Sequence, residues 1–454
     1  MSAPALLDRS SLTRPSSPLG AAIRAAAPQL VGTVASIVGL SIDVAGLPGA
    51  VGDLVSVDTE TGEPTIAEVV AVTPRALRCM PLGPVAGLRV GMAARATGRP
   101  LTAPCGPGLL GRVLDGLGRP MDGKGPVAGP RGARRVSVAG TAPSPLDRAR
   151  VDTPLGLGVR ALDTLVTVGR GQRIGLFAGS GVGKSGLLSM IARGTDAEVS
   201  VIALIGERGR EVREFLEDDL GPEGLARSVV VVATSDQPAM VRLRAASVAT
   251  RIAEEFRSAG SHVVLMMDSL TRVAMAQREI GLSVGEPPAT RGYPPSTFSM
   301  LAQLLERAGT DAQGSVTGIY TVLVDGDDHN EPIADSARSI LDGHVVLSRD
   351  LAVSGHYPAI DVLGSVSRVA GRVTTAEQRS LALGLRQVLA ARKRAQDLLD
   401  VGAYAPGSNA LVDAAVAHAA SIDAFLMQGV DSPAPAHEAW EGLAGLVGQL
   451  GVAR

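Results

Sequence analysis

One segment, Gly175–Ser185, constrains the fold of this chain more than any other stretch. It reads Gly-Leu-Phe-Ala-Gly-Ser-Gly-Val-Gly-Lys-Ser and lies between an apolar run at 174–178 and a helical pattern at 186–192. A strand, a glycine-rich loop and a helix in this order form a P-loop, in which backbone N–H groups turn inward around phosphates and the helix N-terminus adds partial positive charge. The segment therefore predicts a nucleoside triphosphate site.

The loop residues have distinct expected roles. Lys184 can reach the β- and γ-phosphates, and the Ser185 hydroxyl can ligate magnesium. Ala178 stands where the strict pattern has glycine, which is a mild departure because alanine is also small. The alternative, a glycine-rich turn with a chance Gly-Lys-Ser, is disfavoured by the flanking strand and helix. The residues expected to bind the nucleotide are Ala178, Gly179, Ser180, Gly181, Val182, Gly183, Lys184, Ser185 and Gly186.

Composition narrows the class of protein. The 454 residues are enough for two or three domains, and a 45% apolar, 2% aromatic composition predicts cores of Val, Leu, Ile and Ala. A net charge of −2 gives no broad electrostatic reason to bind nucleic acid. Two cysteines, Cys79 and Cys105, cannot form a metal cluster and indicate a reducing compartment. No apolar stretch reaches the ~20 residues of a membrane span, and no signal peptide is recognisable.

The chain divides into four parts by pattern. Residues 1–28 contain four prolines and are expected to form a flexible tail. Residues 29–97 carry short β-type runs punctuated by glycine and proline, which predict a small barrel or sandwich. Residues 98–373 begin with a glycine- and proline-rich connecting region to 150, and then alternate apolar strand-length runs with helical patterns. That alternation predicts a parallel sheet covered on both faces.

Residues 374–454 have a helical pattern. Thr375 with Gln378 fits a capping box that opens a helix ending near Leu399. A second helix is expected from Asn409 to Gly429. Its apolar face would use Leu411, Ala415, Ile422 and Leu426.

Two acidic motifs follow strands of the predicted sheet. The run at 199–205 leads into Gly206-Glu-Arg-Gly-Arg-Glu211, where Glu207 could orient the attacking water and Arg208 could stabilise phosphate oxygens. The alternative for these two is a surface ion pair. The run at 263–267 ends in Asp268, which in a Walker B arrangement binds magnesium together with Ser185. Asp268 could also cap the helix that follows, but burial of its carboxylate favours the metal role.

These motifs together resemble the catalytic ATPase family of rotary ATP synthases and protein-export systems. The resemblance rests on the P-loop, Gly206–Glu211 and Asp268-Ser-Leu-Thr-Arg272, and it extends from about residue 30 to 429. Gly285-Glu-Pro-Pro-Ala-Thr-Arg-Gly-Tyr-Pro-Pro-Ser296 is similar to the flagellar and type III secretion branch. The segment 326–344, with Asn330-Glu-Pro-Ile-Ala-Asp-Ser-Ala-Arg338, resembles the flagellar members.

The resemblance implies an α/β fold: a RecA-like P-loop NTPase core with an N-terminal β-barrel and a C-terminal helical domain. It also implies ATP and Mg²⁺ as ligands, with catalytic roles for Lys184, Glu207, Arg208, Asp268 and Arg368. Tyr357, in Gly355-His-Tyr-Pro-Ala-Ile-Asp361, would stack on adenine, with core packing as the alternative. Arg368, in Ser365-Val-Ser-Arg368, would complete a neighbouring subunit's site as an arginine finger, with a structural salt bridge as the alternative.

The family's partners follow from the same resemblance. A member is expected to form a homohexamer in the cytoplasm, at the inner face of the membrane export gate. It would engage export substrates and chaperones, a stator-like regulatory protein and a central stalk protein. The nearest alternatives are a virulence-type secretion ATPase and the catalytic subunit of a rotary synthase. A non-catalytic ring subunit would be expected to lack Glu207, and a nucleic-acid translocase would need an aromatic platform that residues 30–97 do not contain.

Overall fold

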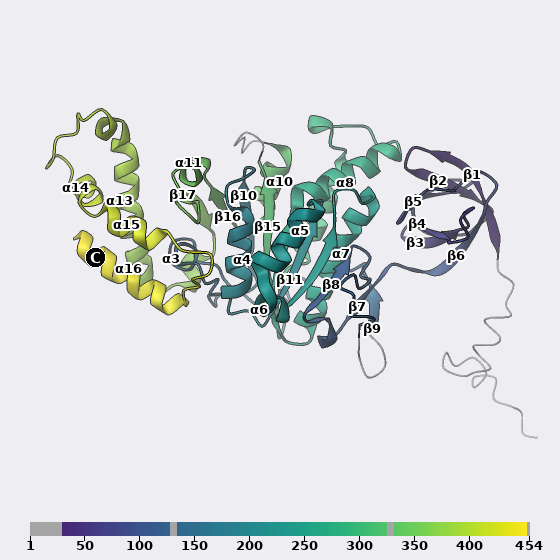
Figure 1. The fold of residues 1–454 in the computed structure, drawn as a ribbon, viewed down its shortest axis with the longest axis horizontal. Coiled ribbons are helices and arrows are strands. Elements are labelled where there is room, and N and C mark those ends of the chain that lie inside the picture. Colours follow the sequence, from purple (N-terminus) through teal and green to yellow (C-terminus); the bar gives the residue numbers. More distant parts are fainter. Residues whose placement is uncertain (1–29, 128–133, 325–330, 452–454) are drawn as a thin grey trace, which may run out of the picture. The chain divides into compact units, whose positions relative to one another are not determined.

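The computed structural model describes residues 30–127, 134–324 and 331–451. The predicted tail at 1–28 and part of the 326–344 motif lie outside these residues. The described residues fall into two compact units, of which the first ends at Arg99 and the second begins at Pro100. Figure 1 shows their elements, with the first unit in purple and the second from blue to yellow. Among the residues described, none of the helices has both the length and the apolar character of a membrane span.

The first unit is a closed six-stranded barrel with strand order β1-β2-β5-β4-β3-β6. Alternate apolar side chains, including Val34, Val44 and Val55, fill its core. The barrel was one of two architectures that the sequence left open. Its closing strand was not predicted, because the segment from Ala93 to Pro100 has no apolar β-branched residue. The strands are β1 (Val31–Val38), β2 (Ser41–Ala45), β3 (Asp53–Val57), β4 (Thr65–Val72), β5 (Leu77–Pro81) and β6 (Ala93–Pro100).

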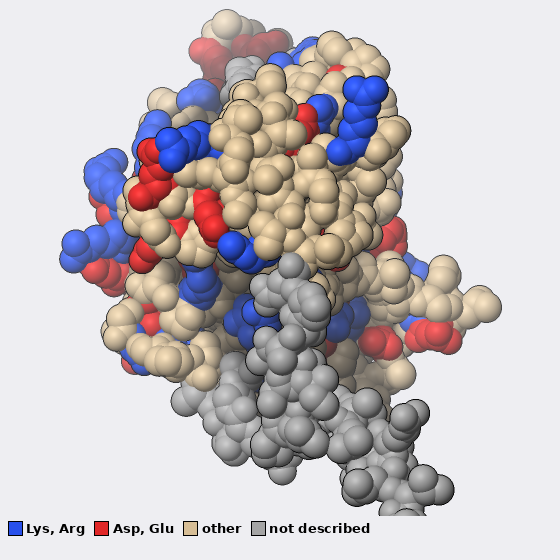
Figure 2. Space-filling view, turned by 90° about the vertical axis from the view of Figure 1, so that its right-hand side faces the viewer, with Lys and Arg blue, Asp and Glu red and all other residues tan. Residues whose placement is uncertain are grey.

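The barrel surface carries few charges over much of the face drawn in Figure 2, where Lys, Arg, Asp and Glu lie mainly toward the edges. Several large apolar side chains of the barrel are exposed to solvent. They are Leu30, Val31, Ile37, Val38, Leu40, Val51, Val72, Val85 and Val90.

The second unit is built on a nine-stranded sheet with order β17-β16-β10-β15-β13-β11-β12-β8, in which β14 pairs with β15. The central pairs are parallel, whereas β16–β17 and β14–β15 are antiparallel. The predicted α/β core is therefore confirmed. The strands are β8 (Arg112–Asp115), β10 (Arg173–Ala178), β11 (Val199–Ile205), β12 (Ser228–Ala233), β13 (His262–Asp268), β14 (Gly309–Thr310), β15 (Ser315–Leu323), β16 (Gly343–Leu347) and β17 (Ile360–Ser367).

The glycine-rich region 98–150 is more than a connection. It supplies β8, which forms an edge of the sheet parallel to β12. It also supplies β7 (Thr102–Cys105) and β9 (Arg134–Ser137), which pair with each other. These strands are only four residues long, so their apolar pattern is too short to predict a strand.

Helices cover the sheet, and α7 packs across β11, β12 and β13. The other side of the sheet shares one apolar core with α4 and the C-terminal helices. The segment that follows β11 forms a short helix, α5, which continues into a π-helical turn at Phe215–Leu220. The helices are α3 (Arg160–Leu165), α4 (Lys184–Gly194), α5 (Gly209–Glu214), α6 (Gly221–Ala226), α7 (Ala239–Ser258), α8 (Leu270–Ser283), α9 (Pro295–Glu306), α10 (Pro332–Ile340), α11 (Arg349–Val353) and α12 (Ala370–Val373).

The C-terminal helices, yellow-green and yellow in Figure 1, gather beyond β17. The predicted capping box of Thr375 and Gln378 is present and opens α13 (Ala376–Asp400). The single helix expected at 409–429 is wrong: His418 leaves helical geometry, and two helices result, α14 (Ala410–Ala417) and α15 (Ala419–Leu426). A further helix, α16 (Ala436–Leu450), was not predicted; it buries Leu443 and packs against α3.

Candidate active site

The P-loop lies at the carboxyl end of β10. Gly181 (φ 78°) and Gly183 (φ 86°) adopt left-handed backbone conformations that favour glycine, and Gly183 caps α4. Val182 between them is buried and anchors the loop. Ala178 is still part of the strand, where its carbonyl accepts a hydrogen bond from the Val324 N–H at 3.1 Å. Strand geometry does not require glycine, so alanine fits this position.

Lys184, Glu207 and Asp268 meet at one edge of the sheet. The Lys184 Nζ lies 2.6 Å from Asp268 Oδ1 and 3.2 Å from Glu207 Oε1. The three side chains are 14%, 15% and 5% exposed, respectively, for Lys184, Glu207 and Asp268. The structure therefore assembles these three predicted residues from loops and strands that are far apart in the sequence.

The charges of this cluster affect one another. Burial alone would lower the pKa of Lys184, but the carboxylates of Asp268 and Glu207 outweigh it and raise that pKa. Burial raises the pKa of Glu207 and the Asp268 carboxylate adds to the shift, while Lys184 opposes it. A single ammonium thus stabilises two buried carboxylates. A triphosphate entering the loop would compete with both carboxylates for Lys184.

Thr321 is a residue of this site that the sequence analysis did not single out. It lies in β15, and its hydroxyl donates to Asp268 Oδ1 at 2.7 Å. The bond fixes the carboxylate that the motif places at the end of β13. A signal was available, because Thr321 is a polar residue inside an apolar strand, and such a residue needs a buried partner.

Tyr357 lies beside the P-loop. A Cβ atom added to Gly183 would come within 3.0 Å of the Tyr357 Cε1, so the ring passes close to the loop backbone. The side chain is 42% exposed, which leaves ring surface accessible to a ligand. Its carbonyl accepts a hydrogen bond from the Gln428 N–H at 2.9 Å. The position suits a ring that stacks on a base whose phosphates lie in the loop.

The two predicted arginines do not join the cluster in this structure. The Arg208 side chain is 78% exposed and pairs with Glu211 on α5 at 2.7 Å. Its catalytic role stays a prediction.

Arg368 lies at the other end of β10. Its backbone N–H donates to the Asp342 carbonyl at 2.9 Å, and the Asp342 N–H donates to the Arg173 carbonyl at 2.8 Å, where β10 begins. At about 3.3 Å per strand residue, the length of β10 separates Arg368 from the P-loop by roughly 15–20 Å. The side chain is exposed, and one guanidinium nitrogen donates to the Arg338 carbonyl at 3.3 Å. The residue is thus remote from its own P-loop and accessible to another molecule.

Family models match the chain from the barrel to the C-terminal helices. They describe the ATP synthase alpha/beta family, beta-barrel domain (residues 34–98), the nucleotide-binding domain of that family (158–367) and the T3SS EscN ATPase C-terminal domain (374–445). The flagellum-specific ATP synthase of Bacillus subtilis (strain 168) is 50% identical over 92% of this chain and 95% of its own length. The chain belongs to the ATP synthase alpha/beta family. It is therefore a P-loop ATPase by family, as the resemblance predicted.

Other members of the ATP synthase alpha/beta family are similarly close. The type 3 secretion system ATPase of Xanthomonas euvesicatoria is 49% identical over 88% of this chain and 90% of its own length. The assembled ATPase EscN from the type III secretion system of enteropathogenic E. coli aligns with a TM-score of 0.85 and 44% identity, over 92% of this chain and 100% of the matched chain. EscN has also been solved in complex with its central stalk EscO, and that structure aligns with a TM-score of 0.84 and 42% identity, over 92% of this chain and 100% of the matched chain.

Proposed function

We propose that this chain is a magnesium-dependent ATPase that energises flagellar type III protein export as a homohexameric ring. The observation that carries the proposal is the contact of Lys184 with Asp268 and Glu207 beside the P-loop. These residues supply a phosphate-binding cation, a candidate metal ligand and a carboxylate able to orient water. The relatives' names and the wording of 286–296 and 330–344 support the export role.

The donor set suits magnesium. Asp268 offers a carboxylate fixed by Thr321, and Ser185 offers an exposed hydroxyl at the start of α4. Oxygen ligands of this kind, completed by water and phosphate oxygens, are what Mg²⁺ prefers. Bound there, the metal would neutralise charge on the phosphate oxygens.

Different residues of this chain act on the phosphates, on the attacking water and on the base. Lys184 moves from the carboxylates to the phosphates, because a triphosphate carries more negative charge. Glu207 then loses its cation partner and is available to accept a hydrogen bond from water. Tyr357 stacks on the base, and Arg208, whose side chain is exposed, stabilises phosphate oxygens. Glu207 thus acts on the attacking water and Lys184 on the phosphates.

Completion of the site by a neighbour follows from the position of Arg368. Because β10 separates it from its own P-loop, its charge is available only to another subunit's phosphates. The exposed apolar side chains of the barrel suit contact with a second copy of this chain. The assembled EscN structure supports a ring, and the EscN–EscO complex supports a central stalk partner.

The remaining parts of the proposal rest on the family resemblance. The ring would work in the cytoplasm, in peripheral contact with the membrane export gate. Export substrates, their chaperones and a stator-like regulatory protein would be its further partners. The four proposed parts of the chain are a tail (1–28), a barrel (29–97), the ATPase core (98–373) and a helical domain (374–454).

A biochemical and a genetic experiment together test the proposal. The purified chain alone should hydrolyse ATP only with magnesium, and its specific activity should rise with protein concentration as rings form. A deletion strain of the source organism should lose filaments and motility but grow normally. Activity that requires a second homologous subunit, or a motile deletion strain with defective ATP synthesis, would assign the chain to a rotary synthase. Loss of injection with intact motility would assign it to virulence-type secretion.

A further inference from the structure

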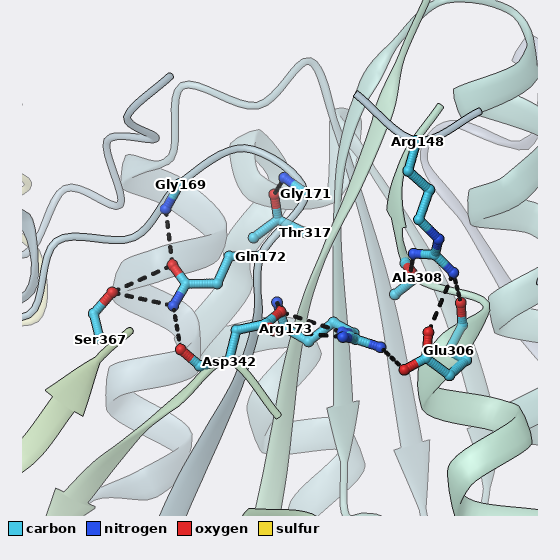
Figure 3. Close-up of polar contacts among 10 residues, drawn as sticks. All are labelled: Arg148, Gly169, Gly171, Gln172, Arg173, Glu306, Ala308, Thr317, Asp342 and Ser367. Carbon is cyan, nitrogen blue, oxygen red and sulfur yellow. Dashed lines mark hydrogen bonds and ion pairs between the residues drawn. The ribbon is translucent and has the colours of Figure 1, made fainter. Parts of the chain in front are cut away.

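A buried glutamine begins the strand that carries the P-loop. Gln172 directly precedes β10 and has no solvent-exposed surface. Figure 3 shows both ends of its carboxamide in use: Oε1 accepts from the Gly169 N–H at 2.9 Å, and Nε2 donates to the Asp342 carbonyl and to Ser367 Oγ, each at 3.1 Å. The Gly169 N–H can only donate, so it fixes which end of the amide faces which partner.

Both partners of the Gln172 amide nitrogen adjoin Arg368. Ser367 immediately precedes it, and the Asp342 carbonyl that Gln172 contacts also accepts the Arg368 backbone N–H at 2.9 Å. The Ser367 hydroxyl in turn donates to the Thr167 carbonyl at 2.7 Å. The backbone that leads into Arg368 is therefore held on two sides by one amide group.

The next residue, Arg173, holds the same segment by its charge. Its backbone N–H donates to Asp342 Oδ2 at 3.0 Å, and its Nε lies 3.2 Å from the same oxygen. The Arg173 guanidinium also pairs with Glu306, whose carboxylate lies 3.3 Å from Arg148 (Figure 3). Consecutive residues at the start of β10 thus fix both the carbonyl and the carboxylate of Asp342.

We propose that Gln172 is a positioning residue for Arg368, and that it ties the finger offered to a neighbouring subunit to the strand that carries the subunit's own P-loop. This inference rests on the proposed function, in which Arg368 acts on the neighbour's phosphates. The arrangement is rigid, because the strand is hydrogen-bonded on both sides to β15 and β16. A small displacement of a charge from its target strongly reduces its effect on a transition state.

The other role open to Gln172 is local: it could merely satisfy the turn at Gly169. The two roles differ in which active site suffers when the amide is lost. A local defect damages the subunit's own P-loop strand, whereas a positioning defect damages only the neighbour's site. Mixed rings separate these outcomes, because a Glu207→Gln subunit still presents an intact Arg368.

The test compares Gln172→Leu with Arg368→Ala, each measured alone and as an equal mixture with Glu207→Gln. Gln172→Leu alone should lower kcat roughly 10- to 100-fold and leave the KM for ATP within about twofold. Mixed with Glu207→Gln, it should regain activity well above the sum of the two variants, as Arg368→Ala should. In those mixtures an intact Glu207 site meets an intact Arg368 at some interfaces.

Two further variants serve as controls, one for damage to folding near Gln172 and one for the hydrogen bond of Gln172 to Gly169. Thr317→Val removes the hydroxyl that accepts the Gly171 N–H at 2.8 Å, a bond beside Gln172 that does not involve Arg368 (Figure 3). It should assemble with near-normal kcat. Ser367→Ala leaves the Gly169 bond intact and should give a smaller, rescuable loss. If Gln172→Leu fails to assemble, Ser367→Ala takes its place in the mixture.

The outcomes separate the inference from the proposed function. Rescue of Arg368→Ala without rescue of Gln172→Leu would show that Gln172 serves its own site, and would overturn the inference alone. Failure to rescue either variant would overturn the trans role of Arg368 and the inference with it. A normal kcat for assembled Gln172→Leu, or an equal loss in Thr317→Val, would also contradict the positioning role.

Discussion

The two ends of β10 carry polar clusters of different kinds. At the carboxyl end, Lys184 forms ion pairs with the two buried carboxylates of Glu207 and Asp268. At the amino end, the uncharged amide of Gln172 holds the backbone next to Arg368, with the Arg173–Asp342 ion pair beside it. In the first cluster, Lys184 can leave the carboxylates for the phosphates of a bound triphosphate, because the triphosphate attracts the ammonium more strongly. In the second, the Gln172 amide makes neutral hydrogen bonds through both of its ends, which suits it to holding a backbone in place.

The largest effect on ATP turnover is expected from substitutions in the charged cluster at the carboxyl end of β10. Lys184→Ala and Glu207→Gln should each reduce ATP turnover by roughly 10²–10⁴-fold or more. They should differ in binding: Lys184 contacts ground-state phosphates, so its loss weakens ATP affinity, whereas Glu207 acts on water and its replacement leaves affinity largely intact. Equilibrium binding of a fluorescent ATP analogue alongside turnover measures both. Near-normal ATP turnover in folded Glu207→Gln would contradict the proposed role of Glu207 in orienting the attacking water.

A smaller effect is expected from Tyr357, which lies at the charged end but carries no charge. Tyr357→Ala should weaken ATP binding by roughly 10-fold, because a stacked base contributes about 1–3 kcal/mol. Tyr357→Phe keeps the ring and should bind within about twofold of the original chain. Calorimetric titration with ATP and with inorganic triphosphate distinguishes the causes. Only ATP affinity should change, and an equal loss for triphosphate would point to a damaged loop instead.

The smallest expected effect is on the pH dependence of kcat, which distinguishes the two ends of β10. Glu207 works as a carboxylate, and burial with the adjacent Asp268 raises its pKa. Activity is therefore complete above that pKa and is lost as the pH falls through it, at a higher pH than for an ordinary glutamate. Gln172→Leu should lower kcat without moving this acid limb, since the amide does not titrate. If the acid limb of the kcat–pH profile moved in Gln172→Leu, the two ends of β10 would not act independently and this contrast would be contradicted.

The Lys184 cluster at the carboxyl end of β10 was predictable from the sequence, whereas the Gln172 cluster at the amino end was not. Lys184, Glu207 and Asp268 each lie in a short motif after an apolar run, and parallel strands bring such ends together. Gln172, Ser367 and the Asp342 carbonyl meet only through sheet order, and a carbonyl leaves no trace in the sequence. The barrel's closing strand, β6, could not be predicted either, because it has no apolar β-branched residue. By contrast, α16 shows the apolar spacing of a helix, at Ala439, Leu443, Leu446, Val447 and Leu450, and was predictable from its pattern. Local pattern predicts the elements with strong apolar periodicity, whereas tertiary packing decides the others.

The central claim is that one β10 strand serves two active sites, its own through Lys184 and a neighbour's through Arg368. The most direct test is an experimental structure of the assembled ring with magnesium, ADP and aluminium fluoride as a transition-state mimic. We expect the Arg368 guanidinium within hydrogen-bond reach, about 3 Å, of the fluoride on the adjacent subunit's P-loop. An Arg368 that contacts the mimic on its own subunit, or that lies far from every nucleotide in a closed interface, would contradict the account.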